Sequence, residues 1–162
     1  MKSLEFLDLS DCSNLKKFPE IAKDMKELSQ LYLDGTTIRE LPSSIERLQG
    51  LQLLSMRNCT SLVFLADSIC NLACLEELSL TGCSKLSNIP QHLVNLESLR
   101  NLEVEGSGIK PLSFTFFKHL KTCYPSMPWP RIHDNHGSFF VDLGATRSKR
   151  KRDKQTEVRV SG

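Results

Sequence analysis

Leucine residues recur at a fixed interval through the first two-thirds of the chain. The recurring unit begins at Leu4, Leu28, Leu51, Leu75 and Leu99, so that successive copies are 24, 23, 24 and 24 residues apart. Five copies at such a nearly constant spacing are not expected by chance. Units of this size cannot bury their apolar residues alone, whereas a stack of them builds a continuous core between neighbours. The chain is therefore expected to fold as an array of repeats.

Each unit combines two hydrophobic periods. In the fourth copy, Leu78 and Leu80 alternate with polar residues, as in a strand with one buried face. Ile89, Leu93 and Leu96 then follow the i, i+4, i+7 spacing of a short helical segment. We expect each unit to form one strand, one sharp turn and one irregular or helical return.

The strand portions share the pattern LxxLxLxx(N/C)xL. Its leucine triplets are Leu4/Leu7/Leu9, Leu28/Leu31/Leu33, Leu51/Leu54/Met56, Leu75/Leu78/Leu80 and Leu99/Leu102/Val104. By this pattern the chain resembles the leucine-rich-repeat family from Met1 to Leu112. The resemblance implies an α/β solenoid, a leucine-rich-repeat horseshoe with a short parallel β-sheet on its concave face.

The turn sequences narrow the resemblance. The units LDLSDCSNLKKFPE and LSLTGCSKLSNIP, with the shorter LYLDGTTIRELPSSIERL between them, are similar to the repeats of plant intracellular immune receptors of the Toll/interleukin-receptor-like, nucleotide-binding, leucine-rich-repeat class. That class implies a disease-resistance function in defence signalling, in which the repeats sense a pathogen effector or a guarded host protein. The sequence has no GxxxxGK[ST] phosphate loop, so nucleotide binding is not assigned to these residues.

Two other functions stay open. The segment IRELPSSIERLQGLQLL also resembles the repeats of general intracellular scaffolds of the small-GTPase-associated leucine-rich-repeat group. That group carries Asn at the turn, whereas this chain carries Cys there three times and Asn never, which favours the plant resemblance. A third hypothesis is that the repeats target a catalytic domain that has been lost from this chain. The leading expectation is a non-enzymatic module without a cofactor or metal.

Charge and period divide the chain into three parts. Residues 1–112 hold the five repeats, residues 113–143 are expected to form a C-terminal cap or irregular extension, and residues 144–162 are expected to form a basic disordered tail. Residues 1–111 carry a net charge of −4 and residues 112–162 a net charge of +6. Ser138–Leu143 is a candidate strand for pairing with the edge of the array. Because Leu4 starts the leucine core without a cap, we expect the chain to be the C-terminal piece of a longer protein.

Two local patterns concern the turns and returns. Cys12, Cys59 and Cys83 occupy one repeat position, inside the turn, and are expected to be buried free thiols. Thr36 and Ser107 replace them in the two shortened units, where a hydroxyl can bond turn backbone. In the second unit, Pro42 with the following serines predicts side-chain caps for the return helix.

The candidate binding surface follows from the strand geometry. Residues flanking the inward leucines face outward on the concave side, and five of the fifteen are carboxylates against one cation. Such a face favours a basic protein partner and disfavours nucleic acid. Aromatic and large apolar side chains are candidate anchors. The predicted protein-binding residues are Phe6, Asp8, Tyr32, Asp34, Leu53, Arg57, Glu77, Glu103 and Glu105.

The C-terminal part offers further candidates. Lys149, Arg150, Lys151 and Arg152 form a basic cluster of the kind that nuclear import receptors read. His119, Cys123, His133 and His136 match no defensible zinc spacing, and no nucleophile has a supporting oxyanion site. No run of 18 apolar residues or apolar signal core occurs, so we expect a cytoplasmic and possibly nuclear location with no membrane contact.

Overall fold

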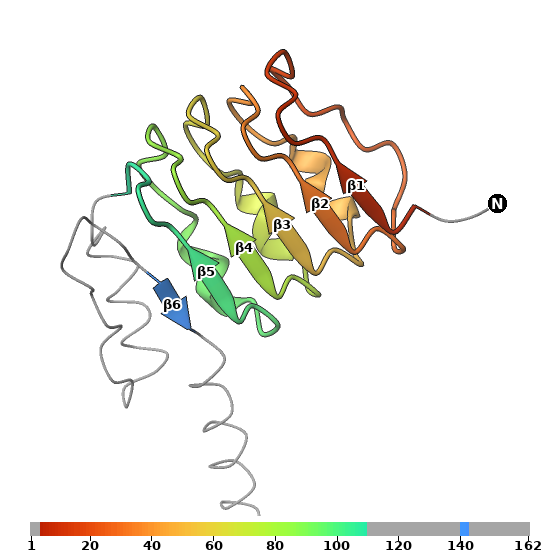
Figure 1. The fold of residues 1–162 in the computed structure, drawn as a ribbon. Coiled ribbons are helices and arrows are strands. Elements are labelled where there is room, and N and C mark those ends of the chain that lie inside the picture. The colour runs from red at the N-terminus through yellow and green to blue at the C-terminus, as the bar shows by residue number, and fades with distance from the viewer. Residues whose placement is uncertain (1–3, 110–139, 143–162) are drawn as a thin grey trace, which may run out of the picture.

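The repeats place one short strand each in a single sheet. A computed structural model describes residues 4–109 and 140–142. Figure 1 shows the strands side by side, with the helical turns behind them. The five repeat strands are β1 (Phe6–Asp8), β2 (Gln30–Tyr32), β3 (Leu53–Ser55), β4 (Glu77–Ser79) and β5 (Asn101–Glu103). They pair in chain order and in parallel, so the predicted parallel sheet is confirmed.

The strand register reproduces the spacing of the sequence. Leu7 pairs with Leu31, Leu31 with Leu54, Leu54 with Leu78, and Leu78 with Leu102. These five side chains point to one face because side chains alternate along a strand. All but Leu7 are at most 1% exposed. The leucine period thus becomes a ladder that forms one wall of the core.

A sixth strand follows the array in the sheet. β6 (Phe140–Asp142) pairs antiparallel with β5, with Leu102 opposite Val141. The strand lies within Ser138–Leu143, where one strand at the array's edge was predicted, and that prediction is confirmed. Apart from β6, the cap or irregular extension expected at residues 113–143 lies outside the described residues, as does the tail expected at residues 144–162.

The returns of three repeats are 3-10 helices. These are η1 (Ser43–Arg47), η2 (Asp67–Asn71) and η3 (Gln91–Asn95), while the return of the first repeat has no helix. A 3-10 helix needs only one or two turns, which suits a return this short. The expected serine caps are wrong. Pro42 precedes η1 with no side-chain cap, and the Ser44 hydroxyl accepts a bond from the Ile21 amide of the first repeat instead (2.9 Å) and donates one to Glu20.

A left-handed residue ends every strand turn. The φ angles are 60° at Asp11, 67° at Gly35, 57° at Asn58, 75° at Gly82 and 60° at Gly106. Asn, Asp and Gly tolerate this region far better than other residues. The side chains of Asp11 and Asn58 also occupy the space beside the glycine of the next repeat. A Cβ at Gly82 would lie only 2.2 Å from Asn58 Oδ1, and one at Gly35 only 2.7 Å from Asp11 Oδ1.

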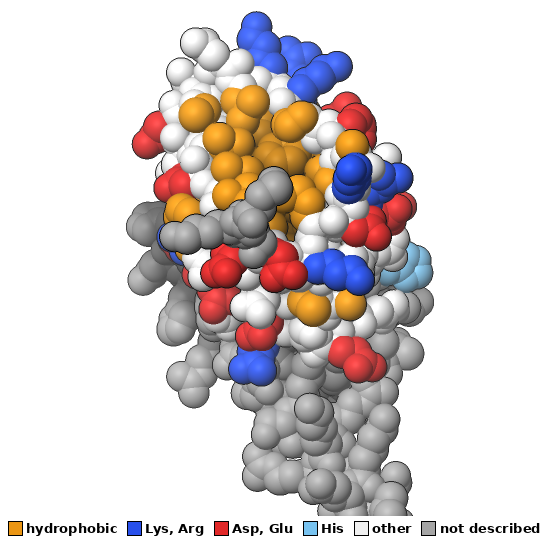
Figure 2. All heavy atoms as spheres, turned by 90° about the vertical axis from the view of Figure 1, so that its right-hand side faces the viewer, with side chains coloured by type: hydrophobic (Ala, Val, Ile, Leu, Met, Phe, Trp, Pro, Cys, Tyr) orange, Lys and Arg blue, Asp and Glu red, His pale blue; other side chains and the backbone are white. Residues whose placement is uncertain are grey.

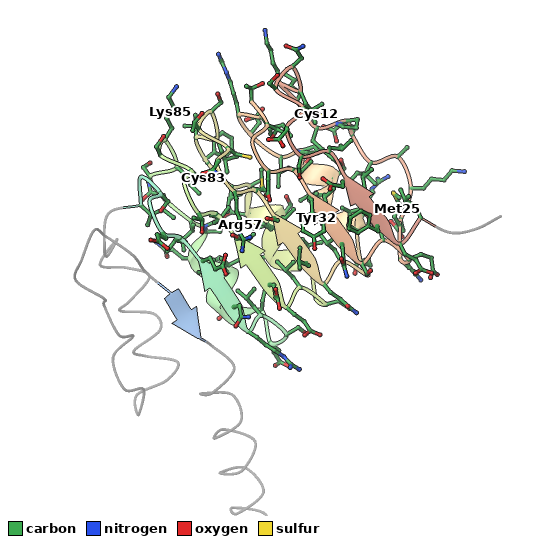
Figure 3. All side chains as sticks on the ribbon, in the orientation of Figure 1. Cys12, Met25, Tyr32, Arg57, Cys83 and Lys85 are labelled. Carbon is green, nitrogen blue, oxygen red and sulfur yellow. The ribbon has the colours of Figure 1, made fainter. Side chains whose placement is uncertain are left out.

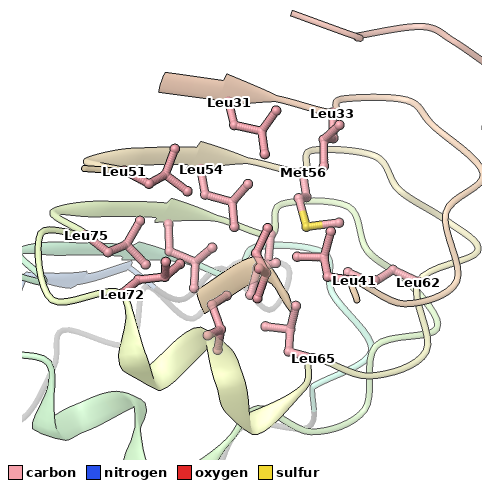
Figure 4. Close-up of a cluster of buried hydrophobic side chains, with 14 of the residues drawn as sticks. Leu31, Leu33, Leu41, Leu51, Leu54, Met56, Leu62, Leu65, Leu72 and Leu75 are labelled. Carbon is pink, nitrogen blue, oxygen red and sulfur yellow. The ribbon is translucent and has the colours of Figure 1, made fainter. Parts of the chain in front are cut away.

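The core is a continuous row of apolar side chains between the sheet and the returns. Figure 4 shows part of it, where side chains from the strands meet those from the loops and the η2 region. At the β1 end the row has no described layer beyond it, and Figure 2 shows hydrophobic side chains gathered there within a rim of charged groups. Leu4 is 47% exposed at this end and lines a hollow of about 340 Å³ with Met25 and Leu28.

The cysteine prediction holds for two of the three turn positions. Cys59 and Cys83 are free and fully buried, and their thiols donate to the carbonyl oxygens of Leu33 (3.1 Å) and Met56 (3.0 Å) in the preceding repeat. The interaction with Cys59, together with burial, raises the pKa of the Cys83 thiol. Cys12 is free but exposed, which corrects the expectation of a buried thiol. The described residues provide no preceding repeat to cover it.

The two hydroxyl residues at the same position behave as predicted. Thr36 Oγ1 donates to the Leu33 carbonyl oxygen (2.8 Å), and Ser107 Oγ donates to the Val104 carbonyl oxygen (2.6 Å). Each bond spans three residues within its own turn. The hydroxyls therefore close their own turns, and Thr36 Oγ1 also lies 3.4 Å from Cys59 Sγ in the next repeat, whereas the thiols donate to the preceding repeat.

Candidate functional site

The concave face is the side of β1–β5 and their following residues that lies opposite the core. Figure 3 shows Tyr32 and Arg57 on it, on neighbouring strand ends. Phe6 at its β1 end is 51% exposed, whereas Ser55 and Ser79 at its centre are only 4% and 8% exposed. Exposure therefore varies strongly among residues that the strand period treats alike.

Aromatic side chains form the β1–β2 end of the face. The Phe6 and Tyr32 rings lie with centroids 5.3 Å apart and planes inclined by 45°. Such a tilted pair at this separation is a favourable aromatic contact. The Tyr32 hydroxyl donates to Gln30 Oε1 (3.3 Å), and Leu53 lies half-buried on the next strand. The predicted anchors are thus adjacent and partly open to solvent.

Asp34 organises the turn between the second and third repeats. Its Oδ1 accepts hydrogen bonds from Ser55 Oγ (2.6 Å) and from the Arg57 backbone amide (2.7 Å). A carboxylate that accepts two bonds is held in one orientation. Asp34 is therefore occupied in joining two repeats and is less available to a partner than the sequence implied.

Arg57 connects the third repeat to the fifth. Its Nη2 lies 2.8 Å from Glu103 Oε2, and its Nε donates to Ser79 Oγ at 2.9 Å. Ser79 Oγ donates in turn to the same carboxylate oxygen at 2.7 Å. The hydrogen bond to Glu103 raises the pKa of Arg57, and the bonds from Arg57 and then Ser79 lower the pKa of Glu103. Both groups are therefore charged at neutral pH.

These groups surround a shallow hollow on the concave face. Its volume is about 130 Å³, enough for part of one side chain. It is lined by the buried Ser55 and Ser79 and by Tyr32, Leu53 and Asn101. The remaining lining residues are Leu54, Arg57, Glu77, Leu78 and Glu103. The lining thus combines apolar and charged side chains, which suits an amphipathic side chain.

The outer carboxylates differ in their bonding. Asp8 Oδ1 accepts the Ser10 amide (2.9 Å), and hydrogen bonding to Ser10 lowers the Asp8 pKa. Glu77 is exposed on β4 and lines the hollow. Glu105 is exposed in the turn after β5. Solvent-facing negative charge therefore concentrates around the hollow and beyond β5, while Arg57 neutralises part of it.

Sequence reasoning identified most residues of the face and missed how they combine. Of the nine predicted residues, five line the hollow, and Asp34 bonds to a sixth lining group, Ser55. Ser55, Ser79 and Asn101 flank the inward leucines and so belong to the outward-facing set, but they are not among the nine predicted binding residues. A small hydroxyl at the same position of two adjacent strands was the available signal, because it leaves room for an arginine to cross above it.

Other candidates are not joined to this face. The basic cluster Lys149–Arg152 and the four His and Cys residues of the rejected zinc set lie outside the described residues. Within residues 4–109 and 140–142, no three His, Cys, Asp or Glu side chains could hold a metal ion. None of the helices described there is long and apolar enough to cross a membrane.

Comparison with known proteins decides the class of repeat. A family model described as a leucine-rich repeat region matches residues 1–122. The chain belongs to the leucine-rich-repeat family. A solved leucine-rich-repeat protein of Leptospira interrogans, LIC12759, superposes with a TM-score of 0.50 and 29% identity over 60% of this chain and 24% of that one.

Curated relatives of the chain include plant disease-resistance proteins, as the resemblance implied. Disease resistance protein RPS4B of Arabidopsis thaliana is 47% identical over 62 residues, or 38% of this chain and 5% of the relative. TMV resistance protein N of Nicotiana glutinosa is 44% identical over 71 residues, or 43% of this chain and 6% of the relative. The matches thus span only a small part of each relative and concern the repeats.

Proposed function

We propose that this leucine-rich-repeat module recognises a protein partner through its concave face and acts in plant defence. The similarity to disease-resistance proteins of Arabidopsis thaliana and Nicotiana glutinosa supports the defence setting. The partner is a pathogen effector, a guarded host protein or a parent receptor. The module itself carries out no catalysis and uses no cofactor, and it works in the cytoplasm or nucleus.

One observation carries the proposal: apart from the core leucines Leu54 and Leu78, the residues that line the hollow lie on the concave side of the sheet and not in the leucine core. Tyr32 and Leu53 present apolar surface beside Arg57 and Glu103, whose side chains are 51% and 35% exposed. Aromatic and arginine side chains are the residues most often enriched at protein interfaces. A rim of carboxylates then favours a basic partner surface.

The partner meets this face in a defined way. A basic side chain entering the hollow contacts the Tyr32 ring and Glu77, while the Arg57–Glu103 pair holds another part of the lining in place. Phe6 extends the apolar contact toward β1. Because Arg57 neutralises Glu103, Glu77 is the carboxylate lining the hollow that attracts a cation most strongly.

Charge reversal tests the proposal. The variant Glu77→Lys, Glu103→Lys, Glu105→Lys is compared with Asp24→Lys, Glu27→Lys, Glu97→Lys, which makes the same change in net charge at exposed positions off the face. Binding to individual candidate effectors and host defence proteins is measured by biolayer interferometry. The first variant should lose affinity about ten-fold or more, and the second should change little. Equal binding by wild type and both variants rejects the concave face.

A further inference from the structure

A second exposed apolar site lies on the loops that follow the strands. Val63 and Phe64 are 47% and 48% exposed, although the leucines on either side of them, Leu62 and Leu65, are buried. Figure 3 shows the edge formed by these loops, where Cys12 and Lys85 are labelled. This pair lies apart from the concave residues discussed above.

The internal repeats show that the fold does not require apolar side chains here. The residue after the buried apolar position of this loop is Lys16, Arg39, Val63 and Ser87 in the first four units, and the next residue is Lys17, Glu40, Phe64 and Asn88. Only the third unit carries two large apolar residues. The Val63 backbone amide donates to the Arg39 carbonyl oxygen (3.0 Å), a bond that any non-proline residue makes.

A single exposed apolar residue is ordinary on a protein surface. Val63 and Phe64 are an adjacent pair, and the packing of the core does not depend on them. Leu62 and Leu65 already supply the inward contacts of the loop, at 0% and 5% exposure. The side chains at Val63 and Phe64 instead enlarge the apolar surface facing solvent. A binding role explains their presence where the equivalent positions are polar.

The charges around the pair define the occupant. Lys16, Lys17, Arg39 and Lys85 are all exposed on the same loops, and none of them forms an ion pair within residues 4–109. The exposed carboxylates on these loops are Asp11, Glu40 in the row of Phe64, and Asp67, which follows three residues after Phe64. Cations therefore outnumber carboxylates on this edge, in contrast to the concave face.

We propose that this loop edge, formed by Val63 and Phe64 with Arg39 and Lys85 beside them, docks an acidic protein segment that carries an apolar side chain between carboxylates. The apolar side chain covers Phe64 and Val63. The carboxylates contact Arg39 and Lys85, with Lys16 and Lys17 extending the attraction. The concave face remains uncovered, so a basic partner and an acidic one can bind together.

The repeats themselves supply the matched variant. Val63→Ser with Phe64→Asn installs the residues that the next unit carries at the same positions, so the fold should be retained, and circular dichroism and the unfolding midpoint check this. The probe is a fluorescein-labelled peptide with a Leu-Phe pair between two runs of aspartate. Two control peptides have Ser-Ser in place of the pair, or lysine in place of aspartate.

Fluorescence anisotropy should show that the double variant binds the acidic Leu-Phe peptide about five-fold or more weakly than wild type. The Ser-Ser and lysine peptides should bind wild type more weakly, and Arg39→Glu should weaken the acidic probe further. The concave triple variant should bind this probe at least as tightly as wild type. Equal binding by the double variant overturns the proposal.

A second copy of the chain is the alternative occupant. Sedimentation velocity across a dilution series distinguishes it from a separate acidic segment. A monomer at all concentrations supports the proposal. Self-association that Val63→Ser, Phe64→Asn abolishes assigns the edge to a second copy and overturns the acidic-segment assignment.

Discussion

The Arg57 guanidinium crosses β4 to reach the Glu103 carboxylate on β5, with Nη2 and Oε2 2.8 Å apart. The crossing passes over Ser79, whose hydroxyl bonds to both partners. One ion pair thereby spans three repeats of an array in which most contacts join immediate neighbours. The relationship fixes the shape of the concave hollow as well as its charge.

A double-mutant cycle should detect this pair. Arg57→Met and Glu103→Gln each remove one charge, and the coupling free energy of unfolding is expected to be about 0.5–1 kcal/mol, because both side chains are substantially exposed and screened by solvent. Urea unfolding measures the four chains. Arg100→Met with Glu76→Gln, a looser pair at 3.6 Å, is the control and should couple more weakly. Equal coupling would contradict the special role of the Ser79 bridge.

The same pair predicts a pH dependence. Hydrogen bonds from Arg57 and Ser79 lower the pKa of Glu103 in the folded chain. The stabilisation is therefore fully present above the ordinary carboxyl pKa of about 4.3 and is lost as the pH falls through the lowered folded value. Glu103→Gln should lose less stability than wild type between pH 6 and pH 3. Parallel stability–pH curves for the two chains would contradict it, since Asp8 titrates alike in both.

The turn glycines differ in their tolerance of a side chain. Gly82→Ala should destabilise the chain by about 1–3 kcal/mol, because the left-handed conformation is strained for alanine and its Cβ meets the Asn58 carboxamide at 2.2 Å. Gly106→Ala has φ of 60° but a nearest contact of 3.7 Å, so it should cost less. Adding Asn58→Gly should recover part of the Gly82→Ala loss. Thermal unfolding of these variants tests the order, and equal costs for both alanines would contradict it.

Thiol labelling should sort the cysteines by burial. Cys12 and Cys74 are exposed, whereas Cys59 and Cys83 are buried. Burial raises the pKa of the half-buried Cys70 to about 11, so little of it is thiolate at pH 8. Iodoacetamide should therefore modify Cys12 and Cys74 first, as mapped by peptide mass spectrometry, and should reach Cys59 and Cys83 only in urea. Early modification of Cys83 would show that the turn opens in the native state.

The basic cluster gives a prediction independent of the array. Deleting Lys149–Arg152 should shift a fluorescent fusion of the full chain from nucleus to cytoplasm, because import receptors bind clustered lysine and arginine. Deleting Thr156–Val160 removes a similar length of tail and should leave the distribution unchanged. A nuclear fraction that persists without Lys149–Arg152 would remove the import role.

The sequence was most informative where geometry repeats. The leucine spacing predicted the sheet, its register and its outward-facing residues, because a side chain's face follows from its place in a strand. It did not predict that Arg57 would join Glu103 at a sequence separation of 46, since side-chain reach across a sheet depends on the bulk of what lies between. The predicted serine cap is absent because the Ser44 hydroxyl instead forms hydrogen bonds with Ile21 and Glu20 in the preceding repeat.

The apolar pair Val63 and Phe64 shows that the sequence pattern alone does not tell which apolar residues of a loop are buried. Both residues fit a hydrophobic loop in the sequence, and only the fold reveals that their neighbours Leu62 and Leu65 take the inward places. Comparison of equivalent positions across repeats then separates what stacking needs from what it does not. Internal repetition thus serves as a control within a single chain.

The antiparallel pairing of β6 with β5 interrupts the parallel pairing of the repeat strands at that edge of the sheet. A parallel ladder continues only if each new strand runs the same way, and β6 reverses that polarity beside Leu102. Engineered lengthening should therefore insert whole 24-residue units between β4 and β5, where the step from Leu78 to Leu102 already has this length. Each inserted unit would widen the recognition surface by one strand while leaving both ends of the array unchanged.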